Sequence, residues 1–235
     1  MIIISSSIPK SGSTLVYNYQ QDLLSMLNSD NKTAQKKYKR LSYLGFTRVI
    51  GIKAFLIAVF ISIKYGDIVI KTHSKPTLFI KLLIALKLAK ATFCYRDPRD
   101  VILSAIDHGT RTRKGLDSSN AFRNMTTINN SLNKVKNWTK KWYAWKKFDN
   151  VLFIRYENLV ESKVSCLQAM SSYFDLGLQE EQITEIYVKN ENIKKSAWNF
   201  NKGTSQRYKT EMDSFNLQLC NRELENVLED MQYSV

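Results

Sequence analysis

The chain has 235 residues, of which 44% are hydrophobic and 24% are charged, close to the averages of globular domains. Only eight glycines and three prolines occur, which excludes a collagen-like or disordered chain, so we expect one domain over residues 1–235. The net charge of +14 predicts an anionic ligand, an acidic partner or an acidic surface.

The three cysteines, Cys94, Cys166 and Cys220, are far apart in the sequence and odd in number. They therefore fit neither a disulfide framework nor a zinc site. The apolar start of the chain is only three isoleucines long, which is too short for a signal peptide. We expect the protein to reside in a reducing cytoplasm.

The opening residues predict a buried strand, a small-residue loop and a helix, in that order. The three isoleucines at positions 2–4 are β-branched, as buried strands prefer. Apolar residues at helical spacing predict a helix over residues 13–28. The N–H groups that open such a helix bind anions, and a lysine in the loop adds positive charge. The loop therefore predicts a phosphate or sulfate site made by Lys10, Ser11, Gly12, Ser13 and Thr14.

The segment Val49–Ile63 is apolar over fifteen residues and contains Lys53. It is shorter than the about twenty residues that span a bilayer. We expect a buried helix or strand there, with a membrane-surface element as the minor alternative. Farther along, Ile68–Ile70 predicts a second buried strand, which leads directly into Lys71-Thr72-His73.

Residues 77–90 predict a helix, and Ala91–Tyr95 predicts a third strand that leads into Arg96. This alternation of strands and helices predicts an α/β fold with a central parallel sheet flanked by helices on both faces. In such sheets, ligands bind beyond the carboxyl ends of the strands. Because Lys10, His73 and Arg96 each follow a predicted strand, we expect these three residues to share one site.

The stretch 109–131 is rich in Arg, Thr, Ser and Asn and predicts a long loop or lid. His108 and Arg111 are candidate substrate-binding residues at this loop. Residues 132–145 predict a helix whose tryptophans belong to the core and whose lysines, Lys141 among them, face water. A fourth strand is expected over residues 151–156. Three later helices are expected at 162–176, 180–188 and 215–231, with a polar loop at 199–209.

The opening motif, Pro9-Lys10-Ser11-Gly12-Ser13-Thr14, resembles the 5′-phosphosulfate loop of the sulfotransferase family, whose common form is PKSGTT. Four further segments resemble the same family in the same order along the chain. They are Lys71-Thr72-His73, Arg96 with Ser104, Phe153–Leu159 with Tyr156, and Lys202-Gly203.

The resemblance implies a P-loop-like three-layer fold and transfer of a sulfuryl group from 3′-phosphoadenosine 5′-phosphosulfate (PAPS) to an acceptor. It implies that His73 is the catalytic base and that Lys10 stabilises the leaving phosphate. It also implies a nucleotide site in which no metal is needed. Its members would be Arg96 and Ser104 at the 3′-phosphate, Tyr156 near the adenine, and Lys202-Gly203 in the loop that closes over the 3′-phosphate.

Two positions depart from the family pattern. Asn201 stands where the family's R-K-G loop has arginine, and Leu15 stands where many members have tryptophan beside the adenine. The acceptor is not specified by the sequence. A hydroxyl or amine of a small molecule, a glycan or a lipid fits, and the basic surface is compatible with peripheral membrane contact.

Two other functions are alternatives to a sulfotransferase. The first is a phosphotransferase or NTPase with a P-loop-like fold. The second is a non-enzymatic protein that uses its charge to bind nucleic acid or a membrane surface, which predicts a steep dependence on salt. We expect no nucleic-acid partner.

Overall fold

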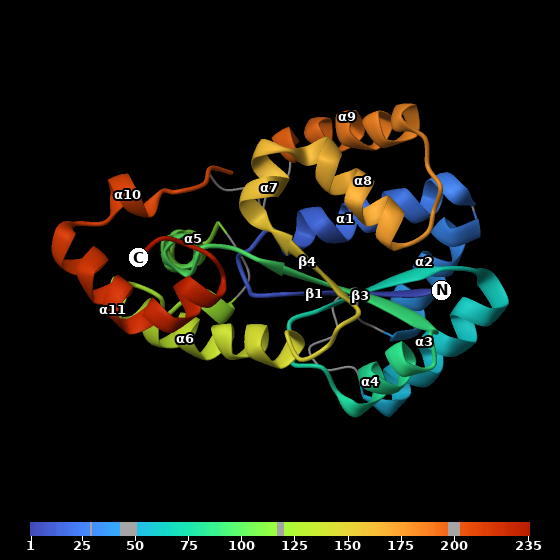
Figure 1. Cartoon of the computed structure of the whole chain (residues 1–235), viewed down its shortest axis with the longest axis horizontal. Helices are drawn as coiled ribbons and strands as arrows, with labels where there is room; N and C mark the ends of the chain where they lie inside the picture. The colour runs from blue at the N-terminus through green and yellow to red at the C-terminus, as the bar shows by residue number, and fades with distance from the viewer. Residues whose placement is uncertain (29, 43–50, 117–119, 197–202) are drawn as a thin grey trace.

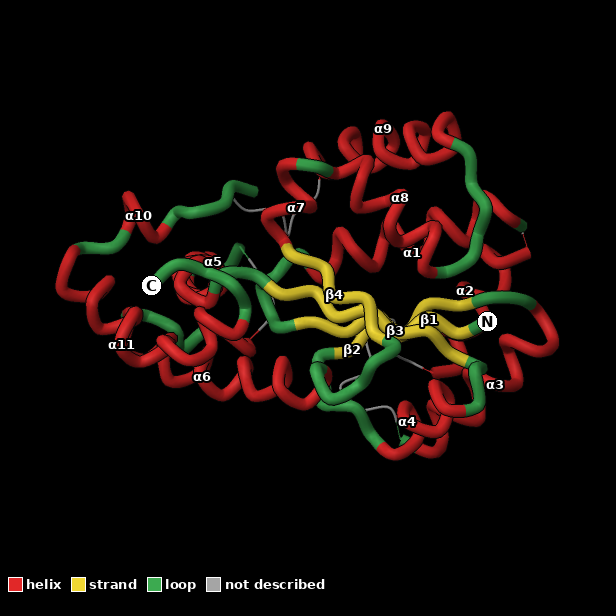
Figure 2. Tube along the Cα trace, viewed as in Figure 1, coloured by secondary structure: helices red, strands yellow, loops and turns green. Residues whose placement is uncertain are grey.

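Four parallel strands form the centre of the molecule in this computed structural model (Figures 1 and 2). Their order across the sheet is β2-β1-β3-β4. The strands are β1 (Ile2–Ser7), β2 (Ile68–Thr72), β3 (Ala89–Tyr95) and β4 (Val151–Arg155). The structure describes residues 1–28, 30–42, 51–116, 120–196 and 203–235, and within helices the side chains at 38–42 and 192–196 are not described.

Helices cover both faces of this sheet, which confirms the predicted architecture (Figure 1). One face carries α1 (Ser13–Leu27), α7 (Tyr156–Glu161), α8 (Lys163–Tyr173) and α9 (Glu180–Ser196). The other carries α3 (Ile52–Tyr65), α4 (Leu78–Ala85), α6 (Ile128–Trp145) and α11 (Ser214–Asp230). Beyond the carboxyl ends of the strands lie α5 (Pro98–Arg113) and α10 (Tyr208–Glu211).

The isoleucines of β1 divide the core into two apolar clusters, one on each face of the sheet. Ile2 and Ile4 belong to the cluster under α3, α4 and α6, whereas Ile3 belongs to the cluster under α1, α8 and α9. Successive side chains of a strand point to opposite faces, so a run of three apolar residues is needed where both faces are covered. The triple isoleucine therefore specifies a central strand.

A helix side chain completes the hydrogen bonding of the edge strand β2. In α2 (Asp30–Ser42), the Gln35 amide Nε2 donates to the Val69 carbonyl oxygen at 3.0 Å, and the Val69 N–H donates to Gln35 Oε1 at 2.7 Å. Both groups of Val69 face outward from the sheet, because β1 pairs with β2 on its other side. Gln35 therefore takes the place that a neighbouring strand would occupy.

Several predicted boundaries were wrong; the helix expected at 180–188, for example, runs on to Ser196 as α9. The helix expected over residues 77–90 ends at Ala85, because the chain turns at Lys87, whose φ is 57°. Ala89 and Lys90 instead begin β3. Tyr156, expected in the fourth strand, is the first residue of α7.

The expected loop at 109–131 is largely helical. α5 runs on to Arg113, the 3-10 helix η1 spans Asn120–Phe122, and α6 begins at Ile128. The polar side chains of α5 bond back to the helix itself, as when Thr112 Oγ1 donates to the His108 carbonyl at 3.1 Å. A Cβ on Gly109 would lie 2.5 Å from the Phe122 carbonyl oxygen. Gly109 thus permits close contact between α5 and the segment around η1.

For the apolar segment Val49–Ile63 we expected a helix or a strand, and from Ile52 it is a helix, α3. Its burial was predicted wrongly, because among its residues only Ala58 and Ile61 are fully buried. Within the described ranges, every helix is too short or too polar to cross a membrane.

We expect Phe93→Ala to lower the free energy of unfolding by about 3–5 kcal/mol, because it leaves a cavity in the centre of the sheet. Phe93 is 0% exposed in β3, and its ring lies 5.9–6.2 Å from those of Trp142, Trp145 and Phe153. Urea unfolding measures the change. The control is Phe215→Ala, at a site that is 75% exposed, which should change the same quantity by less than about 0.5 kcal/mol.

Candidate functional site

The loop between β1 and α1 has two residues in the left-handed region of backbone conformation, Lys10 with φ 69° and Gly12 with φ 82°. Gly12 is the N-cap of α1, and no side chain caps the first N–H groups of this helix. Ser11 is fully buried, and its hydroxyl has no hydrogen-bond partner among the described residues. A buried donor beside an uncapped helix start fits an anion that is hydrogen-bonded there.

Gly12 is required at its position for a second reason. A Cβ on Gly12 would lie 2.7 Å from Cδ2 of Tyr156, which is shorter than a van der Waals contact. Cys94 holds the same loop from the sheet, because its thiol donates to the Ser11 carbonyl oxygen at 2.8 Å. Tyr156 is buried against the loop, so β3, the start of α7 and the loop meet here.

Lys71 on β2 adds a second lysine to the loop. Its Nζ donates to Thr14 Oγ1 at 2.8 Å. Burial lowers the pKa of Lys71 to about 8, and the positive charge of Lys10 acts in the same direction. An anion bound beside Lys71 would offset this repulsion and favour the charged form of the lysine.

His73 lies just beyond the end of β2, with its ring held by the end of β1. Its Nδ1 lies 3.0 Å from the Ser7 carbonyl oxygen and 2.9 Å from Ser7 Oγ. Since a carbonyl oxygen only accepts hydrogen bonds, this contact assigns the proton to Nδ1 and the lone pair to Nε2. Burial, and then the charge of Lys71, lower the pKa of His73 to about 3, so the imidazole is neutral at pH 7.

The side chain of Lys10 extends toward α5. Its Nζ lies 3.2 Å from His108 Nδ1 and 5.4 Å from the centre of the Phe122 ring. The His108 ring is edge-on to Phe122, with centroids 4.6 Å apart, and Phe122 is edge-on to Trp138. One side of Lys10 is thus lined by the rings of His108 in α5 and Phe122 in η1, and Trp138 of α6 packs against Phe122.

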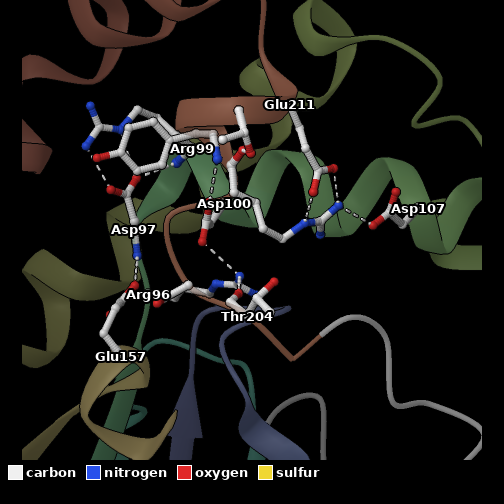
Figure 3. Close-up of polar contacts among 12 residues, drawn as sticks. Arg96, Asp97, Arg99, Asp100, Asp107, Glu157, Thr204 and Glu211 are labelled. Atoms are coloured by element: carbon white, nitrogen blue, oxygen red, sulfur yellow. Dashed lines mark hydrogen bonds and ion pairs between the residues drawn. The ribbon is translucent and has the colours of Figure 1, made fainter. Parts of the chain in front are cut away.

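Arg96 lies between the end of β3 and the start of α5 (Figure 3). Its Nη2 donates to Asp100 Oδ2 at 2.9 Å and to the Thr204 carbonyl oxygen at 2.7 Å. Its guanidinium carbon lies 4.2 Å from the centre of the Tyr156 ring. Arg96 Nε is buried and has no hydrogen-bond partner in the part of the chain that the structure describes. A second anion could therefore be bound by this arginine.

Buried charges fix the start of α5 around Arg96 (Figure 3). Asp97 caps the helix by accepting from the Arg99 N–H at 2.9 Å, and its carboxylate also pairs with the Arg99 guanidinium at 2.8 Å. The Asp97 N–H donates to Glu157 in α7 at 3.3 Å. Asp100 accepts from the Tyr208 N–H at 3.0 Å. Asp97, Arg99 and Asp100 are all buried, so the start of α5 beside Arg96 is well defined.

The structure brings the residues after the first three strands together, since His73 bonds to Ser7 at the start of the Lys10 loop, and Arg96 shares Tyr156 with Gly12. Ser104 lies on α5, 5% exposed, one turn before His108. Gly203 adjoins Thr204 and therefore lies near Arg96.

Two other predicted residues lie on the helices that border this cluster. Ser13 begins α1, and Arg111 lies on α5 beyond His108, so a role for either in binding stays a prediction. Lys202 and Asn201 lie outside the described residues.

Sequence reasoning missed the roles of two lysines. Lys71 shares the α1 face of β2 with Val69, which the two-residue period of a strand could have shown. Lys141, expected to face water, is half-buried, its pKa is lowered by burial, and its charge acts on His73. The hydrogen bond from Trp145 Nε1 to the Ser74 carbonyl, 3.0 Å long, brings α6 to this position.

The sequence and the structure of this chain are similar to those of known proteins. The sequence profile described as "Sulfotransferase domain" matches residues 2–219. An amine sulfotransferase of Oryctolagus cuniculus is 29% identical over 102 residues, which are 42% of this chain. The matched stretch spans only 34% of that relative's length.

Solved structures share the fold. A retinol dehydratase in complex with retinol and PAP aligns with a TM-score of 0.63 at 17% identity, over 97% of this chain and 81% of that chain. A mouse sulfotransferase complexed with PAP aligns with a TM-score of 0.60 at 17% identity, over 99% of this chain and 85% of that chain. These similarities confirm the predicted fold class.

Gly12→Ala should reduce stability more than Gly177→Ala does. Both glycines have positive φ, 82° and 62°, so each substitution costs about 1–2 kcal/mol of backbone strain. Only at position 12 does the new methyl group also collide with Tyr156, because nothing lies within 4 Å of a Cβ on Gly177. Urea unfolding of both variants gives the difference, expected to be about 1–3 kcal/mol. Equal losses would mean that Tyr156 moves aside freely.

The C2–H signal of His73 should not shift between pH 5 and pH 8, because burial and the positive charge of Lys71 lower the pKa of this histidine to about 3. Lys71→Met removes a positive charge and should raise this pKa. With only two histidines in the chain, a His108→Gln variant assigns the C2–H signals. A midpoint near the ordinary value of about 6.5 would contradict the burial of the ring.

Proposed function

The chain belongs to the sulfotransferase domain family, and we propose from this and from its site that it transfers a sulfuryl group from PAPS to a hydroxyl or amine. The observation that carries the proposal is the meeting of Lys10, Lys71 and His73 at the ends of β1 and β2. Two cations beside a neutral imidazole suit a reaction in which phosphate leaves with negative charge while an acceptor loses a proton.

PAPS would supply the activated sulfuryl group. The residues that would hold its 5′ end are Lys10 and the loop Ser11–Thr14, with Lys71 behind Thr14. The unsatisfied Ser11 hydroxyl and the uncapped start of α1 are the observations that fit an anion there. Arg96 and Ser104 would hold the 3′-phosphate, and Tyr156 would lie near the adenine.

In this proposal His73 is the general base. The hydrogen bond to Ser7 keeps the proton on Nδ1, so Nε2 can accept the proton of the acceptor group. Burial and the charges of the neighbouring lysines lower the pKa of His73 to about 3. Bound phosphate would offset the charges of Lys71 and Lys10, raise that pKa and make the imidazole a better base.

Lys10 would stabilise the negative charge that grows on the departing phosphate. Its ammonium group lies 3.2 Å from His108 Nδ1. The acceptor would lie on the same side, against His108 and Phe122, with Arg111 farther along α5. The retinol dehydratase structure contains retinol beside PAP, which supports an acceptor with a large apolar part. A small molecule or lipid fits these aromatic rings better than a glycan does.

The three cysteines bear on location. Cys94, Cys166 and Cys220 are all free thiols, which supports the reducing cytoplasm expected from the sequence.

Binding of 3′-phosphoadenosine 5′-phosphate (PAP) without added magnesium tests the nucleotide site. Calorimetry should show that PAP binds at least tenfold more tightly than AMP or ATP, because only PAP carries the 3′-phosphate that Arg96 would hold. Tight ATP binding that requires magnesium would favour the phosphotransferase alternative. Affinity for DNA spread over many lysines, with a steep salt dependence and no effect of PAP, would favour the non-enzymatic alternative.

Arg96→Lys should reduce the preference for PAP over AMP, because lysine keeps the charge but loses the planar fork of donors. Complete removal of the charge would leave buried Asp100 unpaired, which costs about 3–5 kcal/mol and obscures the result. A matched control is Arg222→Lys on α11, an exposed arginine, which should leave both affinities unchanged. An unchanged PAP preference in Arg96→Lys would remove Arg96 from the 3′-phosphate site.

His73→Ala should retain PAP affinity but lose about 10²–10⁴-fold in transfer rate, the usual contribution of a general base. Radiolabelled PAPS with a panel of alcohols, phenols and amines measures the transfer. His73→Asn is the structural control, since its amide can still donate to Ser7 but cannot accept a proton at pH 7. Full activity in either variant would exclude His73 as the base.

A further inference from the structure

Exposed apolar side chains are concentrated on two neighbouring helices, α3 and α4. Of the fourteen large hydrophobic side chains that are exposed among the described residues, eight lie between positions 52 and 88. They are Ile52, Leu56, Phe60, Ile63, Leu78, Leu82, Leu86 and Leu88. Soluble proteins rarely expose so many large apolar groups together, so this concentration indicates a surface that is covered in use.

These side chains form stripes on the outer faces of the helices. Positions 52, 56, 60 and 63 follow helical spacing on α3, as do 78, 82 and 86 along α4 and its C-cap. The opposite sides are buried, by Ala58 and Ile61 in α3 and by Ile80 and Leu83 in α4. The ring centroids of Phe55 and Phe79 are 5.4 Å apart, so the two helices are in contact (Figure 1).

Positive charges predominate in the segment that carries these stripes. From residue 51 to residue 96, Asp67 is the single acidic residue, and it pairs with the amino group of Met1. Five lysines of this region are exposed, namely Lys53, Lys64, Lys75, Lys81 and Lys87. Long lysine side chains can extend their ammonium groups outward beside an apolar surface that is buried.

We propose that this surface, which we call the α3–α4 face and define by the eight apolar residues and five lysines above, binds an anionic lipid bilayer. The apolar stripes would enter the boundary between headgroups and acyl chains, and the lysines would contact acidic headgroups. α3 has 14 residues and α4 has 8, so neither helix is long enough to span the bilayer, and both would lie along its surface.

Charge favours a bilayer over a second copy of the chain. A twofold dimer through this face would place the same patch on both subunits and bring lysines toward lysines, with no acidic side chain of the face to pair with them. An anionic bilayer offers both an apolar interior and negative charge, which matches the two properties of the α3–α4 face. Binding through this face does not depend on the reaction that the chain catalyses.

Co-sedimentation of the full chain with vesicles tests the proposal. Vesicles of phosphatidylcholine with roughly a third phosphatidylserine should bind the protein at least tenfold more strongly than phosphatidylcholine alone. The triple variant Leu56→Ser, Ile63→Ser, Leu78→Ser should reduce this binding at least tenfold. The control is Leu116→Ser, Val188→Ser, Phe215→Ser, three exposed sites elsewhere, which should change it less than about twofold.

A second pair of variants separates the face from the general charge of the protein. The triple variant Lys53→Gln, Lys64→Gln, Lys81→Gln should weaken vesicle binding. The control variant Lys114→Gln, Lys134→Gln, Lys140→Gln, at exposed lysines of the α5 C-cap and of α6, removes equal charge and should weaken it much less. Equal loss in both sets would overturn the proposal, because attraction would then be unspecific. So would a concentration-dependent dimer in light scattering that the Leu56, Ile63 and Leu78 variants abolish. Circular dichroism and PAP binding show whether each variant is folded.

Discussion

Parallel pairing of β1 with both β2 and β3 is the constraint on which the candidate site depends. The register sets Ser6 beside Thr72 and Ser7 beside Cys94, so all three strands end at the same edge of the sheet. Residues that are more than sixty positions apart in the chain, such as Ser7 and His73, come within hydrogen-bond distance there. A slip of one residue would turn His73 and Lys71 away from the loop.

Several positive charges lie close to one another at this edge of the sheet. Lys10, Lys71 and Lys141 all lower the pKa of His73, and burial lowers the pKa of Lys71. On the other side of Tyr156, Arg96 is matched by Asp100, and Asp97 by Arg99. The arginines on the α5 side of the site are thus paired with carboxylates, whereas the loop side contributes the positive charges of Lys10 and Lys71. A bound anion is therefore stabilised most strongly on the loop side, where these lysines lie.

Much of the fold could be predicted because short apolar runs such as residues 2–4 and 68–70 have only one stable place in an α/β protein, the buried sheet. The position of the loop between β1 and α1 could be predicted, because small polar residues there separate an apolar run from a segment with helical spacing. Burial of α3 was predicted wrongly, since apolar composition alone does not say which face of a helix the core covers. The polar composition of residues 109–131 predicted a loop, because composition does not show that a side chain such as Thr112 hydrogen-bonds to a carbonyl of its own helix.

Contacts that join distant segments were the least predictable part of the site. The Thr204 carbonyl oxygen contacts Arg96 through its backbone, so its side chain carries no signal of this role. The approach of Lys10 to His108 depends on where α5 lies beyond the sheet, which no local pattern determines. Lys71 was the exception, because strand periodicity alone is enough to place its side chain against α1.

The two hydrogen bonds between Gln35 and Val69 limit self-association through the edge strand β2. An unprotected outer strand can recruit a strand from another chain and so begin an aggregate. Here the donor and acceptor of Val69 are already used by a side chain whose amide does not titrate, so the protection is the same in acid and in base. At that residue the sheet cannot grow by adding a copy of itself unless α2 first moves away.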